Sequence, residues 1–183
     1  MKRLFVPLPE LINQYVPQHE EEILFQKDFL KLLQNPNAYL RDHLPGHITG
    51  SAFVLNPARS KVILLHHKNL DRWLQPGGHA DGDEDILQVA LRELEEETGL
   101  GGAKLLSPGI FDLDIHPIPE RKGFPAHLHY DVRFLFEADD RNQLIVSDES
   151  LDVKWVALQE LNTLSDSPSI HRMAWKVMRI FAQ

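Results

Sequence analysis

The 183-residue sequence contains no cysteine, so disulfides, thiolate metal sites and a cysteine nucleophile are all excluded. It also lacks a run of about 18 apolar residues, which is the length that a membrane-spanning helix needs. Near the start of the chain, Pro7, Pro9 and Glu10 interrupt the apolar residues before the hydrophobic segment of a signal peptide would be complete. These absences predict a cytoplasmic protein with no membrane partner.

Basic charge is also scarce. The sequence has 19 lysines and arginines against 27 acidic residues, which gives a formal net charge of −8. A general nucleic-acid or anionic-membrane binder would show a basic footprint instead, so the charge argues against both classes of partner. A phosphate-bearing small molecule stays compatible with this charge, because bound cations reverse the local field.

The length predicts one domain of ordinary size with an N-terminal addition. We predict a helical extension over residues 1–44, packed on a main domain over residues 45–183. Residues 1–18 are expected to be irregular, and Glu20–Gln34 is expected to form a helix that stops at Asn35-Pro36, because proline disfavours helix at the residue before it. A homodimer contact through this extension stays open.

The main domain alternates segments typical of strands with segments typical of helices. The predicted strands are His47–Leu55, Lys61–His67, Leu105–Ile115, His127–Ala138 and Asp152–Ala157, with a loop at His116–Pro125 and a helix that begins at Ser167-Pro168. The first two strands are separated by a turn-forming linker and are expected to pair as an antiparallel hairpin. Strands that follow one another in this way favour an α+β fold or a mixed-sheet sandwich over a regular βαβ order.

Strict alternation marks the strand His127–Ala138. One face carries only apolar side chains, and the other carries His127, His129, Asp131 and Arg133. This polar face predicts either a solvated surface or one wall of a ligand cleft, and the pattern does not choose between them.

The most unusual stretch is Gly78–Leu100, which has eight carboxylates between Asp81 and Glu97. On a helix over residues 84–97, an apolar stripe forms, and Glu93, Glu96 and Glu97 cluster beside it, while Glu95 points elsewhere. Carboxylates at one helix edge repel one another, and a hard divalent cation gives a reason for the cluster. The alternative is an acidic surface helix in which Arg92 is an ordinary salt-bridge partner.

The spacing in this stretch is specific. Gly78 is followed after five residues by Glu84, and after seven more by Arg92-Glu93-Leu94-Glu95-Glu96-Glu97-Thr98-Gly99-Leu100. This matches every fixed position of the Nudix box, so the sequence resembles the Nudix hydrolase family, over roughly residues 45–160. The resemblance implies an α/β/α sandwich with a mixed sheet. It also implies Mg²⁺-dependent hydrolysis of a nucleoside diphosphate linked to another moiety, with Mn²⁺ as the alternative ion.

The resemblance also assigns roles within the box. Glu93, Glu96 and Glu97 would bind the metal together with the carbonyl of Gly77, and Glu84 and Arg92 would hold the loop-helix-loop together. We therefore group Arg92 with the catalytic residues. The catalytic base would be a box glutamate such as Glu96, or an acid from a later loop. Glu149 stands six residues before Trp155, as a functional glutamate often does in relatives, and is our candidate.

Substrate identity does not follow from the box. The candidates for substrate contact lie outside it and are His116, His127, His129, Asp131 and Arg133. The histidines among them also suit metal binding or hydrogen bonding within the sheet. The expected substrate is a small-molecule nucleotide or nucleotide sugar. The alternatives are an RNA 5′-end pyrophosphohydrolase and a non-catalytic nucleotide sensor, whereas the lack of cysteine argues against an isomerase on the same fold.

Overall fold

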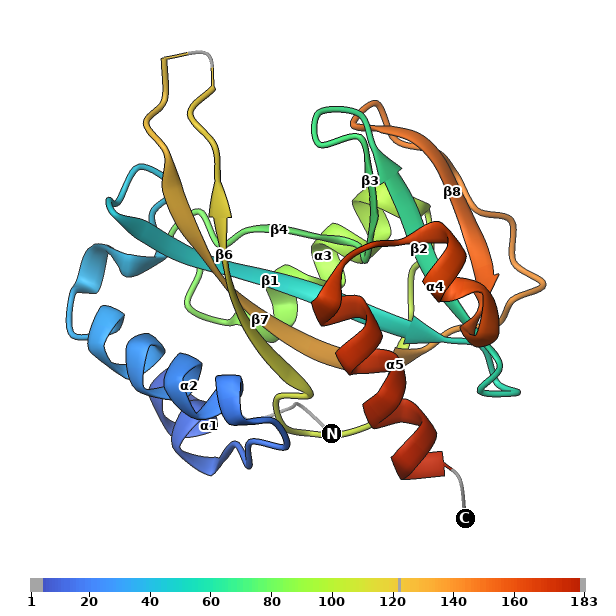
Figure 1. The fold of residues 1–183 in the computed structure, drawn as a ribbon, viewed down its shortest axis with the longest axis horizontal. Helices are drawn as coiled ribbons and strands as arrows, with labels where there is room; N and C mark the ends of the chain where they lie inside the picture. The colour runs from blue at the N-terminus through green and yellow to red at the C-terminus, as the bar shows by residue number, and fades with distance from the viewer. Residues whose placement is uncertain (1–4, 122, 182–183) are drawn as a thin grey trace.

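The computed structural model describes residues 5–121 and 123–181 and has one mixed sheet with helices on both sides (Figure 1). The strands are β1 (Gly46–Leu55), β2 (Lys61–His67), β3 (Arg72–Leu74), β4 (Gly77–His79), β5 (Lys104–Leu105), β6 (Asp112–Ile118), β7 (His127–Glu137) and β8 (Ser150–Ala157). Their order is β3-β2-β1-β7-β5, with β4 beside β1, β6 beside β7 and β8 beside β2. The parallel pair β1–β7 among antiparallel pairs confirms the predicted mixed sheet.

The helices are α1 (Leu8–Gln14), α2 (Glu20–Leu32), α3 (Ile86–Thr98), α4 (Leu161–Leu164) and α5 (Pro168–Phe181), with 3-10 turns η1 (Pro36–Tyr39) and η2 (Leu158–Glu160). Figure 1 shows α5 in front of the sheet and α3 behind it. Alternate residues of β1 belong to two different apolar clusters: Ile48 packs in the cluster with α3, and Phe53 packs in the cluster with α5. This two-sided burial confirms the sandwich. No helix in the described part of the chain is both long enough and apolar enough to cross a membrane.

The N-terminal segment differs from the prediction. Residues 8–14 form helix α1, so the expectation of an irregular segment was wrong there. The error is understandable, because Pro7 and Pro9 lie at the helix start, where a missing N–H has no intrahelical partner to lose. Leu8 and Phe29 are fully buried in the same cluster as α3, so α1 and α2 complete the core. The domain boundary at residue 44 stays a prediction.

A second difference concerns the segment after α3. The predicted strand Leu105–Ile115 is two strands, β5 and β6, and β6 continues to Ile118. His116 was expected in a loop but lies in β6 opposite His129. Pro117 is tolerated there because proline fits a strand that is not hydrogen-bonded on its second side. Tertiary pairing with β7 therefore overrides the loop signal of the prolines.

A buried ion-pair network fills the space between β6, β7, α2 and α5. Asp112, which is fully buried, accepts hydrogen bonds from Arg133 (3.1 Å), Arg172 (2.7 and 3.0 Å) and Lys176 (2.6 Å). Lys176 also bonds Glu22 of α2, which connects the N-terminal helices to the C-terminal one. Buried charges persist only when they are paired in this way.

Acid is expected to weaken this network. Burial alone would raise the pKa values of Asp112 and Asp114, but Arg133 and Arg172 outweigh it and hold both pKa values below the ordinary 3.8. Because the folded-state pKa lies below the unfolded one, the stabilisation is complete above about pH 4 and is lost as the pH falls towards the folded value. Each carboxyl then removes up to about 1.4 kcal/mol per pH unit. Urea unfolding at pH 7, 4, 3 and 2.5 measures this loss, and a constant free energy of unfolding down to pH 2.5 would contradict it.

Candidate active site

Helix α3 carries the carboxylate cluster, and its ends are fixed locally. The side chain of Asp85 caps the start by accepting a hydrogen bond from the backbone N–H of Gln88 at 3.4 Å. Gly99 ends the helix with a φ of 73°, a left-handed conformation that glycine adopts without strain. The buried side chains Ile86, Ala90 and Leu94 press the helix onto β1. This packing therefore keeps the carboxylates along one edge of α3 close to the sheet.

Glu97 is the most buried of these carboxylates, with 6% of its surface exposed. It accepts a hydrogen bond from the backbone N–H of Gly77 at 2.8 Å. Burial, together with the charges of Glu93 and Glu149, raises the pKa of Glu97 to about 8 against the lowering effect of that hydrogen bond. Burial also raises the pKa of Glu93. Ionisation of Glu93 and Glu97 is therefore disfavoured in the folded protein.

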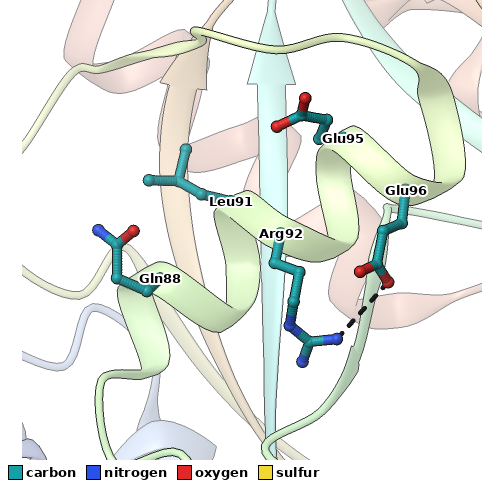
Figure 2. Close-up of a pocket in the computed structure, with 5 residues that line it drawn as sticks. All are labelled: Gln88, Leu91, Arg92, Glu95 and Glu96. Atoms are coloured by element: carbon teal, nitrogen blue, oxygen red, sulfur yellow. Dashed lines mark ion pairs between the residues drawn. The ribbon is translucent and has the colours of Figure 1, made fainter.

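Arg92 joins the helix to the loop before it. Its guanidinium lies 2.9 Å from Glu93 and 3.5 Å from Glu96, and it donates a hydrogen bond to the carbonyl of His79 at 3.0 Å. Figure 2 shows Arg92 and Glu96 on one side of α3 and Glu95 on another. Arg92 thus contacts both the helix and the backbone of β4, while Glu84 is exposed just before the helix, and the roles that the resemblance implies for them stay predictions.

The donor set fits a hard divalent cation. Within residues 5–121 and 123–181, no lysine, arginine or histidine forms an ion pair with Glu97, although its carboxylate is buried. A Cβ at Gly78 would lie 2.5 Å from the carboxyl group of Glu93. Any residue other than glycine at this position would therefore displace that carboxylate. Carboxylate oxygens without a counter-charge are the ligands that Mg²⁺ prefers.

A cleft of about 470 Å³ is lined by His79, which follows Gly78, and by Glu149, whose charge acts on Glu93 and Glu97, although none of the three α3 carboxylates lines it. The titratable residues that line it are His47, His67, His79, His127, His129, Glu149, Glu120, Arg41 and Arg121. The sheet register explains the histidines: His47 of β1 lies opposite His129 of β7, which in turn lies opposite His116 of β6. The ring of His116 is 5.5 Å from that of His129, measured between centroids. Three strands therefore bring their histidines into one row.

Three of these histidines, His47, His79 and His129, have lowered pKa values. Burial, Arg41 and the neighbouring imidazoles together lower the pKa of His79 to about 4. Burial and the neighbouring imidazoles lower the pKa of His129 to about 2. Burial lowers the pKa of His47 as well. Neutral imidazoles provide lone pairs, so this wall of the cleft offers nitrogen ligands and hydrogen-bond acceptors rather than positive charge.

The family model of the NUDIX domain matches residues 46–175. The chain belongs to the Nudix hydrolase family. As a Nudix hydrolase it is an enzyme that acts on nucleoside diphosphates linked to another moiety, in a family that generally uses a divalent metal.

Known Nudix proteins resemble the chain over most of this range. A probable DHNTP pyrophosphohydrolase of Lactococcus lactis subsp. cremoris is 29% identical over 133 residues, which cover 71% of this chain and 77% of that protein. An asymmetrical bis(5′-nucleosyl)-tetraphosphatase of Mus musculus is 32% identical over 100 residues, which cover 54% of this chain and 65% of that one. The crystal structure of a C. elegans Ap4A hydrolase binary complex matches with a TM-score of 0.60 and 20% identity, covering 74% and 97% of the two chains.

Of the five predicted substrate contacts, His127 and His129 line the cleft of this Nudix fold, whereas His116, Asp131 and Arg133 do not. Arg133 is 2% exposed and is paired with Asp112, Asp114 and Asp131, and Asp131 also accepts hydrogen bonds from Thr49 and Ser51. Neither Arg133 nor Asp131 lines the cleft. Substrate contact by these two residues stays a prediction, and the structure places their charges in pairs inside the protein. The polar face of β7 is therefore divided: its first half faces the cleft and its second half faces the ion-pair network.

Sequence reasoning missed several residues of the cleft. His47, His79 and Arg41 line the cleft but were not among the candidates. His79 follows Gly78 directly in the chain, and this position could have identified it as a candidate site residue. His47 and Arg41 carry no such signal, because they reach the cleft only through the pairing of β1 with β7 and through the ion pair of Arg41 with Asp81.

Replacing Gly78 by alanine is expected to lower activity at least tenfold and to leave the fold intact. The new Cβ would meet the end of the Glu93 side chain, which can rotate away, so the carboxylate moves while the backbone stays. Loss of one positioned charge at the site costs a few kcal/mol of transition-state stabilisation, and about 1.4 kcal/mol is tenfold in rate. Gly109→Ala is the control, because no atom lies within 4 Å of its Cβ position. Unchanged kcat/KM in Gly78→Ala would contradict the placement of Glu93.

Proposed function

We propose that this Nudix hydrolase cleaves the diphosphate bond of a nucleotide or nucleotide sugar with the help of Mg²⁺. The observation that carries the proposal is the pair Glu93 and Glu97: both are largely buried, their charges repel, and the charge of Glu149, which lines the cleft, acts on both. This arrangement destabilises the protein unless a cation completes it.

Glu93, Glu96 and Glu97 would hold the ion, with the carbonyl of Gly77 as a further ligand. Bound there, Mg²⁺ or Mn²⁺ would neutralise the phosphates and act as a Lewis acid on the bond that breaks. Arg92 keeps this set in place by contacting Glu93, Glu96 and the backbone of β4 at the same time.

Glu149 is our choice for the catalytic base. It lines the cleft, is solvent-exposed, and its charge acts on both Glu93 and Glu97, so it lies close to the carboxylate cluster without belonging to its helix. A carboxylate in this position can take the proton of the attacking water. Glu96 is the alternative base, because it is also exposed and belongs to the box.

Glu149→Gln is expected to lower kcat by roughly 100-fold or more with little change in KM, since a general base contributes about 10²–10⁴ to the rate. Its thermal stabilisation by Mg²⁺ should equal that of the wild type, because the box carboxylates remain. Asp148→Asn is the matched control on the same loop, with the neighbouring carboxylate exposed. If Glu149→Gln keeps the wild-type kcat, the base is a box glutamate, and Glu96→Gln should show the loss instead.

The cleft favours a substrate with several phosphates. Arg41 and Arg121 add positive charge, and His116 lies beside the row of neutral histidines. The curated relatives are named for a DHNTP pyrophosphohydrolase activity and for the cleavage of bis(5′-nucleosyl) tetraphosphates. These names put nucleoside polyphosphates first in the test, followed by nucleotide sugars.

A chromatographic screen of nucleoside triphosphates, dinucleoside polyphosphates, nucleotide sugars and 5′-triphosphate RNA, with Mg²⁺ or Mn²⁺, tests the proposal. Each product identifies the substrate class and the phosphorus attacked. Turnover of one small nucleotide class that disappears with EDTA is the expected result. Turnover of RNA alone would replace the proposed substrate, and tight binding of a nucleotide without any turnover would make the protein a sensor.

A further inference from the structure

The row of histidines in the cleft contains an arrangement that the carboxylate chemistry does not use. One ring nitrogen each of His47, His127 and His129 lies within 4.8 Å of the other two. His127 and His129 are two residues apart on β7 and therefore point to the same face, and His47 lies opposite His129 on β1. Three imidazoles from two paired strands thus converge at one point of the cleft wall.

Backbone carbonyls fix which nitrogen of two of these rings is free. Nδ1 of His47 lies 3.3 Å from the carbonyl of His43, and Nδ1 of His127 lies 2.8 Å from the carbonyl of Pro125. A carbonyl only accepts hydrogen bonds, so each Nδ1 carries the proton, and in the neutral ring each Nε2 keeps its lone pair. Metal-binding histidines in proteins are oriented by the same kind of hydrogen bond at their other nitrogen.

Within the described residues, the buried Nε2 of His47 has no hydrogen-bond partner, and Nε2 of His127 accepts its hydrogen bond from the third imidazole. Nε2 of His127 lies 3.3 Å from Nε2 of His129. Two nitrogens bound to one tetrahedral Zn²⁺ at about 2.0–2.1 Å are separated by about 3.3 Å, so this pair already has the spacing of two ligands.

We propose that His47, His127 and His129 bind a borderline divalent transition metal of the Zn²⁺ class through their Nε2 atoms, at a site separate from the carboxylates of α3. Imidazole prefers Zn²⁺, Co²⁺, Ni²⁺ and Cu²⁺, whereas carboxylates prefer Mg²⁺ and Mn²⁺, so the two sites select different ions. Three protein ligands leave a fourth position, which is available to water or to a ligand in the cleft. This site does not depend on the proposed hydrolysis.

Cobalt titration of the full chain tests the site without an activity assay. Co²⁺ is added at pH 8 in excess Mg²⁺, which occupies the carboxylates, and binding is followed by visible absorption and by calorimetry. The wild type is expected to bind one equivalent with the intense absorption of tetrahedral Co²⁺, and Zn²⁺ should displace it. His127→Ala and His129→Asn should each lose that absorption and bind Co²⁺ at least tenfold more weakly.

Two control variants define the site. His66→Asn should bind Co²⁺ like the wild type, because His66 pairs with Asp71 and stacks on Trp73 outside the cleft. Glu97→Gln should also keep the absorption, because its carboxylate belongs to the other site. Circular dichroism and thermal unfolding establish that His127→Ala, whose side chain is only half-buried, is folded. The proposal is overturned if the wild type shows no stoichiometric tetrahedral Co²⁺, if both histidine variants retain it, or if Glu97→Gln abolishes it.

Discussion

Glu97→Gln is expected to reduce kcat/KM by roughly 1,000-fold, because a bound cation supplies several kcal/mol of charge stabilisation and each 1.4 kcal/mol is tenfold in rate. Glutamine has the same shape and can still accept the hydrogen bond that the Gly77 backbone donates at 2.8 Å. The change therefore removes one negative charge from the cluster and little else. Steady-state kinetics on the substrate found by the screen, with Mg²⁺ in excess, measures the loss.

The same variant should be at least as stable as the wild type without metal. Burial and the charge of Glu93 disfavour the ionised form of Glu97, and its pKa is therefore raised to about 8. A neutral side chain at this position removes that unfavourable free energy from the folded state. In thermal unfolding, Mg²⁺ should raise the Tm of the wild type more than that of Glu97→Gln. Glu95→Gln is the control, because Glu95 is exposed and points away from Arg92 and Glu96 (Figure 2). Wild-type turnover in Glu97→Gln, or an equal loss in Glu95→Gln, would refute the assignment of the site.

Asp112→Asn is expected to cost about 3–5 kcal/mol of unfolding free energy, which is the usual effect of removing one partner from a buried ion pair. Asp112 accepts hydrogen bonds from Arg133, Arg172 and Lys176, and asparagine would leave three buried cations short of negative charge. For a domain of this size, 1 kcal/mol corresponds to about 2–4 °C in Tm. Urea unfolding and calorimetry at pH 7 should therefore show a fall in Tm of roughly 10 °C.

The exposed pair of Asp139 and Arg141 provides the control for this effect. Asp139→Asn breaks an ion pair in water, where solvation and salt screening leave such a pair little effect on stability. In addition, Asp112→Asn should weaken the acid dependence of stability below pH 4, because one of the titrating groups is gone. A change of less than 1 kcal/mol in Asp112→Asn would show that the network stabilises the fold much less than its burial indicates.

The local patterns of the sequence were informative about the elements that form the site. The predicted strands at residues 47–55, 61–67 and 127–138 match β1, β2 and β7 to within one residue at each end, and the predicted helix begins two residues early but ends before Gly99 as expected. Each of these segments has a strong period or a strong cap, such as Gly99 at the end of α3. The weak points were segments rich in proline, where α1 and the end of β6 formed because neighbouring elements cover them.

The sequence by itself determined the family, the sandwich and the carboxylate helix, because residue spacing along one helix is a local property that sequence displays directly. Only the tertiary structure decided what surrounds that helix. The parallel pairing of β1 with β7 joins segments far apart in the chain and places His47 beside His129. Asp131 and Arg133 face inwards, where Arg133 pairs with Asp112 and Asp114 of β6 and with Asp131 itself, and no periodicity in β7 distinguishes this from a solvent-facing position. Register and burial depend on which partner strand lies alongside, and that information is absent from any single stretch of sequence.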